Sequence, residues 1–327
     1  MNCSFYFNLI NLSILHNVKM KVLQEQLKFK LTRYAPTPSG FLHLGNIFSF
    51  IFTYHIAKRF DAKIQLRIDD LDSERVKNKY LQDIFDTLDF LGLPYHLGPK
   101  NIKEFKEEYS QQNRRSLYDK AVETLKDSGQ LFACDCSRKK IRNLHPKGYY
   151  TGYCHQRNLE FESPDVAWRM RLDGSSKIIL NDLLKGRVES KVPQEIAFCI
   201  IRRKDGLPAY QLASLVDDLH YGTDLIVRGR DLWASSLVQV SIASQLPSNN
   251  FSKSLFLHHP LFKGPDNKKL SKSFGATSIR NLRKSGNKKE AIFRLIGAYL
   301  KLEKPLNCLE DFEFLSQLTN QSPQRKK

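Results

Sequence analysis

The stretch at residues 33–46, RYAPTPSGFLHLGN, limits the possible folds more than any other part of the chain. A short apolar run before it, at 29–31, predicts a strand, and the large apolar residues of 47–60 predict a buried helix. Two prolines and a glycine exclude regular structure in between, so the backbone has to turn sharply there. Backbone N–H groups at the start of a helix favour an anion, and His43 and Gly45 suit a phosphate. A turn of this composition, taken alone, is more often a simple connection.

A second stretch, KKLSKS at residues 268–273, is basic and rich in hydroxyl groups. It suits the negative charge that develops on a departing pyrophosphate, although a solvated run of charge is the alternative. Together, His-Leu-Gly-Asn at 43–46 and Lys-Leu-Ser-Lys-Ser at 269–273 resemble the two ATP-binding motifs of class I aminoacyl-tRNA synthetases. The first departs from the usual His-Ile-Gly-His at its second and fourth places, and the second has Leu for Met. The resemblance implies that ATP is a substrate, accompanied by Mg²⁺, and that His43 and Lys272 are catalytic. The ATP-binding residues that it implies are His43, Gly45, Asn46, Lys269, Ser271, Lys272 and Ser273.

A formal net charge of +18 indicates a polyanionic partner, most commonly a nucleic acid. With 41% hydrophobic and 26% charged residues, the 327-residue chain has the composition of a globular protein. A membrane-surface protein would also be basic, but no apolar run approaches the length of a spanning helix, so we expect no membrane. Residues 1–27 are expected to be a leader, either an over-extended start or a disordered tail. Their apolar part is not expected to be a signal peptide, since it lacks a basic start and a small-residue cleavage site. The six unevenly placed cysteines favour a metal in a reducing compartment over disulfides, and we expect a cytoplasmic monomer.

Strand and helix patterns alternate at both ends of the chain, which is the order of a parallel sheet covered by helices. An acidic cluster, DDLDSER at 69–75, follows the second expected strand, at the edge where open α/β sheets bind ligands. Its Asp72 or Ser73 can equally be a helix cap. The expected strands lie at 29–31, 63–68, 224–231 and 255–257, and the expected helices at 47–60, 76–91, 117–125, 237–246 and 288–302.

Between these two parts, Cys134 and Cys136 are followed by Cys154. Three thiolates bind zinc tetrahedrally when a fourth ligand is present, and His155 is the generic candidate. The alternative is three free cysteines in a small insertion. Alternating apolar residues at 166–172, with further strands at 178–180 and 196–201, predict that this insertion is antiparallel.

Several motifs in one order resemble the glutamyl branch of the class I synthetases over residues 33–275. They are RYAPTPSG at 33–40, RIDDLD at 67–72, Tyr210 and VRG at 227–229. The glutamate-binding residues that the resemblance implies are Arg33, Tyr34, Ala35, Pro36, Thr37, Asp69, Tyr210 and Arg228. Arginines suit the two carboxylates of glutamate, Asp69 suits its ammonium and Tyr210 can donate a hydrogen bond. The family usually has Glu at the position of Asp69, and Asp reaches one methylene less far.

Cys-x-Cys followed by Tyr-x-x-x-Cys resembles the glutamyl-queuosine (glutamyl-Q) tRNA(Asp) synthetase family, and Tyr150 with Cys154 has that spacing. One structural zinc bound by Cys134, Cys136, Tyr150 and Cys154 is therefore implied, with His155 as the alternative fourth ligand. The residues after Ser273 leave little room for an anticodon-binding region, which favours the same family. That family attaches glutamate to queuosine in the anticodon loop of tRNA(Asp).

The resemblance implies an α/β fold in which a class I synthetase Rossmann-type parallel sheet is split by a zinc-bearing insertion. The expected segments are a leader (1–27), the first half of the catalytic domain (28–129), the insertion (130–204), the second half with the KLSKS loop (205–278) and a helical C-terminal region (279–327). The implied function is activation of L-glutamate by ATP, without tRNA, and transfer of the glutamyl group to queuosine. The alternatives are a small glutamyl-tRNA synthetase that charges the acceptor end and an inactive zinc-containing RNA-binding protein.

Overall fold

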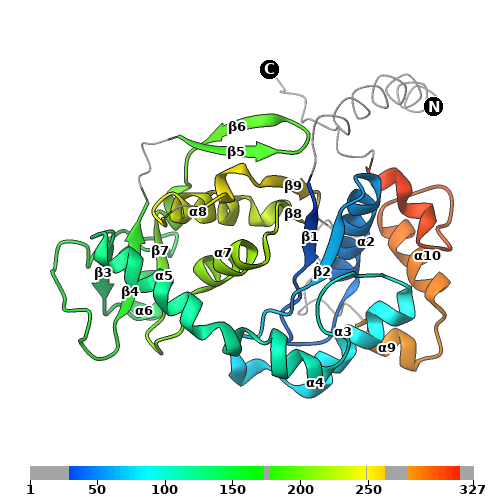
Figure 1. Cartoon of the computed structure of the whole chain (residues 1–327), viewed down its shortest axis with the longest axis horizontal. Helices are drawn as coiled ribbons and strands as arrows, with labels where there is room; N and C mark the ends of the chain where they lie inside the picture. The colour runs from blue at the N-terminus through cyan, green and yellow to red at the C-terminus, as the bar shows by residue number, and fades with distance from the viewer. Residues whose placement is uncertain (1–28, 173–176, 248, 262–277, 317–327) are drawn as a thin grey trace.

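The computed structural model describes residues 29–172, 177–247, 249–261 and 278–316. Parallel strands and the helices around them form the larger part of the molecule, and a small antiparallel sheet lies at the end opposite the C-terminal helices (Figure 1). The strands are β1 (Leu31–Tyr34), β2 (Lys63–Leu66), β3 (Leu131–Cys134), β4 (Ala167–Arg171), β5 (Ile178–Asp182), β6 (Gly186–Ser190), β7 (Phe198–Arg202), β8 (Leu225–Gly229) and β9 (Leu255–His259). The α-helices are α2 (Leu44–Arg59), α3 (Asn78–Leu91), α4 (Ile102–Glu104), α5 (Arg115–Asp127), α6 (Arg138–Leu144), α7 (Tyr210–Tyr221), α8 (Trp233–Ala243), α9 (Ile279–Lys284) and α10 (Lys289–Tyr299).

The parallel pairings expected from the alternation of strands and helices are present. β1 pairs in parallel with β2, and β8 pairs in parallel with β9, so the α/β prediction with a parallel sheet is confirmed. β1 starts at Leu31 and includes Arg33 and Tyr34, which the sequence assigned to the turn. This shift matters, because it fixes the first residues of the predicted site on a rigid strand.

One carboxylate joins the two parallel pairs. The Asp224 side chain, just before β8, accepts hydrogen bonds from the backbone N–H groups of Lys30 (2.9 Å) and Leu31 (2.8 Å) at the start of β1. The Asp224 N–H donates in turn to the Leu31 carbonyl oxygen at 3.2 Å. β1 is thereby held beside β8, and their carboxyl ends lie at the same edge of the molecule.

The insertion differs from the prediction in one respect. β3, β4 and β7 form the expected antiparallel sheet, but the strand predicted at 178–180 does not belong to it. That strand is β5, which pairs in parallel with β9 and in antiparallel fashion with β6. A short apolar strand carries no sequence signal for its partner, because pairing is decided by which strand edge remains open.

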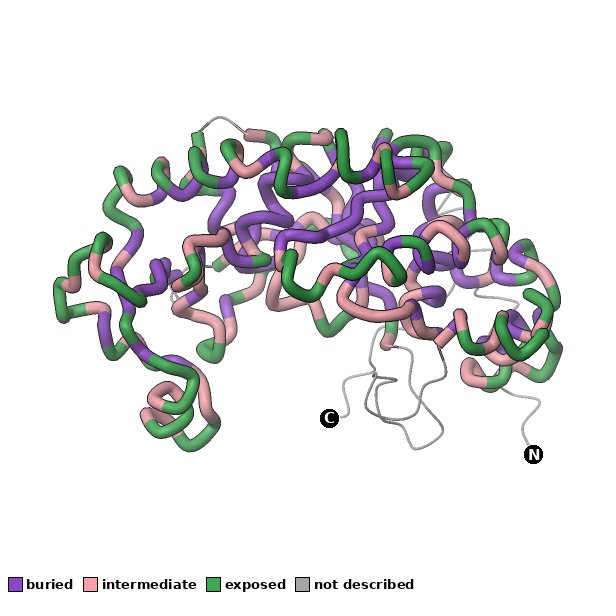
Figure 2. Tube along the Cα trace, turned by 90° about the horizontal axis from the view of Figure 1, so that it is seen from below, coloured by how far each residue is buried: buried purple, intermediate pink, exposed green. Residues whose placement is uncertain are grey.

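The helix that follows the turn, α2, is buried on nearly all sides. Its aromatic and branched residues pack against the sheet, and its outer face is covered by the C-terminal residues around α10 (Figure 1). Figure 2 shows the buried residues mainly in the interior of the molecule. His55, in the middle of α2, lies 2.8 Å through Nε2 from the Leu309 carbonyl oxygen. Within the described residues, no helix is long and apolar enough to cross a membrane.

Replacement of Asp224 by Ala should lower the free energy of unfolding by about 2 kcal/mol, because two strand N–H groups lose a charged acceptor. Urea unfolding measures this change. Asp224→Asn keeps one acceptor oxygen and should lose less, and Asp127→Ala, at an exposed position of α5, should leave stability within about 0.5 kcal/mol. Equal effects of the two Asp224 substitutions would contradict this role of the carboxylate.

Candidate active site and metal centre

A cavity of about 270 Å³ lies between the carboxyl ends of β1 and β8 and the start of α2. It gathers nine residues predicted from the sequence, namely Arg33, Tyr34, Ala35, Pro36, His43, Gly45, Asn46, Tyr210 and Arg228. Thr37 and Asp69 do not line it. A larger hollow of about 640 Å³, between α5 and the end of α7, contains none of the predicted site residues. The smaller cavity is therefore the candidate active site.

The start of α2 is closed by a reciprocal cap. The His43 Nδ1 accepts the Gly45 N–H at 3.1 Å, and the Asn46 Oδ1 accepts the His43 N–H at 3.1 Å. An accepting Nδ1 places the ring proton of neutral His43 on Nε2, which can donate to a phosphate. The Gly45 amide is thus already used by His43.

Two buried arginines that line the cavity, Arg33 and Arg67, share one buried aspartate, Asp218. Asp218 accepts from the Arg33 Nε at 2.8 Å and from the Arg67 Nη1 at 2.7 Å. Burial alone would raise the pKa of Asp218, yet the two guanidinium groups hold it below its usual value. Asp218 is therefore ionised and fixes both arginines at the end of the strands.

Asp69 is also bound to Arg67. Its two oxygens lie 2.8 Å from Nε and 3.1 Å from Nη2 of that side chain, and 8% of the residue is exposed. Burial raises the pKa of Asp69, and Arg67 opposes this effect. Its expected contact with the glutamate ammonium stays a prediction, and it requires the carboxylate to serve Arg67 and the ligand together.

Arg228, on β8, is a buried cation without a carboxylate among the described residues. Its Nη2 donates to the Gln239 Oε1 at 2.8 Å, whereas Nε and Nη1 have no hydrogen-bond partner in the part of the chain that the structure describes. Burial lowers the pKa of Arg228 to about 10, so the group stays charged at neutral pH. Three buried guanidinium groups, Arg33, Arg67 and Arg228, thus face two buried carboxylates, Asp69 and Asp218, and an incoming anion can complete the balance.

The sequence motifs predict no role for Arg67, Asp218 or Gln239. Arg67 stands in RIDDLD, a stretch that the sequence analysis singled out, whereas Asp218 lies outside the motifs named there. Their roles depend on which face of a strand or helix meets another element, which the motifs do not give. Gln239 has no signal beyond its place in an apolar helix.

The second predicted motif cannot be placed. Lys269, Ser271, Lys272 and Ser273 lie outside the described residues, which end at 261 before this loop and resume at 278. Their roles remain predictions.

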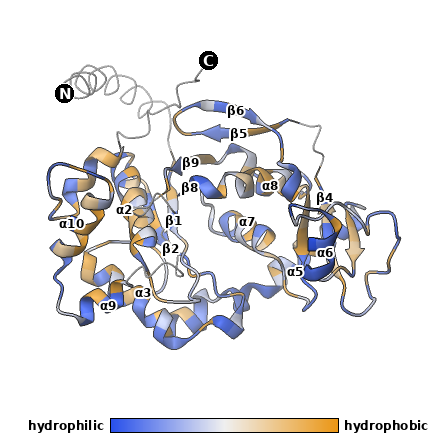
Figure 3. Ribbon diagram, turned by 180° about the vertical axis from the view of Figure 1, so that it is seen from behind, coloured by the Kyte–Doolittle hydropathy of each residue, from blue (hydrophilic) through white to orange (hydrophobic). Residues whose placement is uncertain are grey.

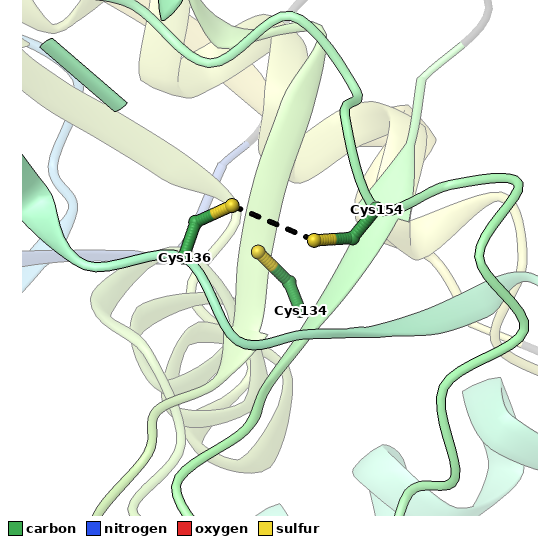
Figure 4. Close-up of side chains that lie close together, drawn as sticks. All are labelled: Cys134, Cys136 and Cys154. Carbon is green, nitrogen blue, oxygen red and sulfur yellow. Dashed lines mark hydrogen bonds between the residues drawn. The ribbon is translucent and has the colours of Figure 1, made fainter. Parts of the chain in front are cut away.

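The cysteine cluster is formed by β3 and the loop that follows α6. The sulfur atoms of Cys134, Cys136 and Cys154 all lie within 4.8 Å of one another, and those of Cys136 and Cys154 are 3.5 Å apart (Figure 4). The Tyr150 hydroxyl accepts the Cys154 N–H at 2.7 Å. His155 packs its ring against Phe132, with centroids 5.0 Å apart, and is not among the clustered ligands.

Three convergent, buried thiols with a phenol beside them fit the donor set of a structural zinc site. Zinc bound there would join the end of β3 to the 150–154 loop. The three thiolates would hold the metal, and the rings of Phe132 and Phe198, which pack against the cluster, would limit the access of water to it.

Comparison with known proteins identifies one family, that of the class I tRNA synthetases for glutamate and glutamine. The family model for the catalytic domain of class I tRNA synthetases (E and Q) matches residues 31–324. A glutamate–tRNA ligase of Sulfurihydrogenibium is 30% identical over 90% of this chain and 64% of its own length. That of Oleidesulfovibrio alaskensis is 33% identical over 78% of this chain and 54% of its own length. The chain spans about half to two thirds of these curated relatives. The crystal structure of glutamate–tRNA synthetase from Elizabethkingia anophelis has the same fold, with a TM-score of 0.65, 22% identity and coverage of 83% of this chain and 61% of that chain.

Arg228→Gln should weaken glutamate binding at least about 30-fold, because the substitution removes a buried cation that lines the cavity and has no carboxylate partner among the described residues. Calorimetric titration with glutamate measures the change in Kd. Arg230→Gln is the matched control, since Arg230 is exposed and does not line the cavity, and it should stay within about twofold. An unchanged Kd in Arg228→Gln would remove this residue from the site.

The purified chain should contain one zinc ion, measured by elemental analysis. Cys134→Ser should lose the metal and lower the thermal midpoint, because metal binding and folding of the module are coupled. His155→Ala should retain the metal. A Cys134→Ser variant with full zinc content would contradict the proposed ligand set.

Proposed function

The chain belongs to the class I tRNA synthetase family of the glutamate and glutamine enzymes, and from this we propose that it activates L-glutamate with ATP. A carboxylate oxygen of glutamate attacks the α-phosphorus, the bond to the bridging oxygen breaks and pyrophosphate leaves. The glutamyl-adenylate then passes its acyl group to a hydroxyl of RNA and releases AMP. The observation that carries this proposal is the buried Arg228 guanidinium, which lines the cavity beside the start of α2 and has no carboxylate partner among the described residues.

The residues contribute position and charge, and no covalent nucleophile is needed. Arg228 binds a carboxylate of glutamate, and Tyr210, which is 47% exposed at the cavity, donates a hydrogen bond. The segment from Arg33 to Pro36 forms one wall. Thr37, which follows it, is proposed to bind glutamate as well, and Asp69 is proposed for the ammonium. His43 binds ATP phosphates through Nε2, and Lys272 with its neighbouring loop residues meets the charge on pyrophosphate, with Mg²⁺ accompanying ATP.

The finer proposal is transfer to queuosine in the anticodon loop of tRNA(Asp). It is supported by the Cys-x-Cys and Tyr-x-x-x-Cys pattern, whose side chains lie together, and by the basic composition of the chain. Charging of the acceptor end by a small glutamyl-tRNA synthetase is the comparable alternative. An inactive RNA-binding protein is less favoured, because a buried cation such as Arg228 is costly to keep without a ligand. A monomer in a reducing, cytoplasmic setting suits a site of free thiols.

The decisive experiment supplies glutamate, ATP and purified tRNAs. We expect glutamate-dependent ATP–pyrophosphate exchange without RNA, and transfer to tRNA(Asp) that carries queuosine. Transfer should survive removal of the 3′ end of the tRNA. It should fail on tRNA(Asp) that carries unmodified guanosine in place of queuosine. Glutamate on the 3′-terminal adenosine would establish the acceptor-end alternative, and no exchange at all would contradict activation.

A further inference from the structure

The turn that leads into α2 is held by two helices that do not line the candidate active site. Figures 1 and 3 show these helices, α3 and α9, side by side, and neither supplies a residue to the cavity around His43. Asp83, on α3, is 1% exposed, and its Oδ1 accepts a hydrogen bond from the Arg283 Nη2 of α9 at 2.8 Å. Such a charge-assisted bond to a buried carboxylate fixes the two helices relative to each other.

The other oxygen of the same carboxylate binds the turn. The Asp83 Oδ2 accepts the backbone N–H of Leu42 at 3.0 Å, and the Leu42 carbonyl oxygen accepts the N–H of Ile279, the first residue of α9, at 2.9 Å. The backbone of Leu42 is thus bound on one side by α3 and on the other by α9. Because Leu42 directly precedes His43, which caps α2, these two bonds fix the place from which the His43 side chain enters the cavity.

The residue before Leu42 is held by the same two helices. The Phe41 ring packs edge-on against Tyr80 of α3, with ring centroids 4.9 Å apart, and the Arg280 Cζ of α9 lies 4.6 Å from the Phe41 centroid. Contacts of a ring with an aromatic edge and with a guanidinium are both attractive. Two successive residues of the turn therefore contact both helices, which an ion pair between the helices would not require.

α9 is also the helix that follows the second predicted ATP-binding stretch. Its first residue, Ile279, is the sixth residue after Ser273 in the chain. The Asp83 side chain is therefore bound both to the residue before the first predicted ATP-binding stretch and to the helix after the second.

The arginines predicted to bind glutamate are held elsewhere. Arg33 is bound by Asp218 of α7, and Arg228 is bound by Gln239 of α8. A change at Asp83 should for this reason alter the His43 side of the cavity and spare the arginines.

We propose that Asp83 is a positioning residue for ATP, which acts by holding the turn before His43 against α3 and α9. The inference rests on the proposed function, in which His43 binds the ATP phosphates. Asp83 itself touches no substrate, since it does not line the cavity. Its effect is on geometry, and a small displacement of a group that orients a reactant has a large effect on rate.

The test compares Asp83→Asn with the wild-type full chain. The amide keeps one acceptor oxygen, so it cannot accept from Leu42 and Arg283 through two oxygens as the carboxylate does. Binding of fluorescent methylanthraniloyl-ATP with Mg²⁺ gives a Kd, and glutamate-dependent ATP–pyrophosphate exchange gives kcat and the KM for ATP. We expect the Kd and the KM to rise at least about fivefold and kcat to fall at least about tenfold. The Kd for glutamate, measured by calorimetric titration, should stay within about twofold.

Asp86→Asn is the matched control. Asp86 lies on the same helix, and its Oδ2 is 3.6 Å from the Arg283 Nη1, but it accepts no hydrogen bond from the turn. All four constants should stay within about twofold in this variant.

Arg283→Gln breaks the bond to α9 and leaves the bond from Leu42 to Asp83 in place. We expect the KM for ATP to rise about threefold. The same substitution should have a smaller effect in the Asp83→Asn background, because both changes act through one carboxylate.

Equal losses of ATP and glutamate affinity in Asp83→Asn would indicate a merely structural role and would overturn the proposal. Unchanged ATP binding in Asp83→Asn, or an equal effect of Asp86→Asn, would also overturn it. If Asp83→Asn does not fold, Arg283→Gln decides by the same criteria, since the Arg283 side chain is 19% exposed. A wild-type chain that binds the ATP analogue but gives no exchange contradicts glutamate activation alone, and Asp83 is then judged by ATP binding. A wild-type chain that binds no ATP overturns both.

Discussion

The buried carboxylate of Asp218 is the interaction on which the candidate active site depends. It lies on α7, yet it holds Arg33 of β1 and Arg67 after β2, so three elements far apart in sequence converge on one charge. Without Asp218, two guanidinium groups would remain buried without sufficient negative charge, which is strongly unfavourable. This one ion-paired cluster therefore orients both arginines at the strand ends. Because Asp218 is engaged by Arg33 and Arg67, Arg228 can bind an incoming anion.

The neighbouring residue on α7, Asp217, points in another direction and binds residues in α5 and just before it. It accepts from the Arg114 Nε at 2.9 Å, the Tyr118 hydroxyl at 2.6 Å and the Gln111 Nε2 at 2.8 Å. Gln111 also binds the strand end that carries the acidic cluster, through its N–H to Asp70 at 2.7 Å. Successive positions on a helix point in different directions, so two adjacent aspartates join α7 both to the cavity and to α5. The acidic cluster is therefore positioned by polar bonds as well as by packing.

The metal module is built on a different principle. Its small antiparallel sheet has few large apolar residues of its own near the cysteines, and the thiols of Cys134, Cys136 and Cys154 form much of its buried cluster together with Tyr150. A small module of this kind gains stability from a metal in place of an extensive core. The helix between Cys136 and Cys154, α6, carries four lysines and arginines among its seven residues.

The sequence by itself determined the parallel α/β fold, the turn before α2 and the clustering of the three cysteines, because each depends on local pattern: periodicity, proline and glycine, and spacing along the chain. It placed Arg33, His43 and Arg228 in one site through motifs alone. Only the tertiary structure decided that β5 joins β9, that Asp69 is bound by Arg67, and that Asp218 and Gln239 hold the arginines. These outcomes depend on which strand edge and which helix face meet in space, and residues distant in sequence leave no local pattern that records such a meeting.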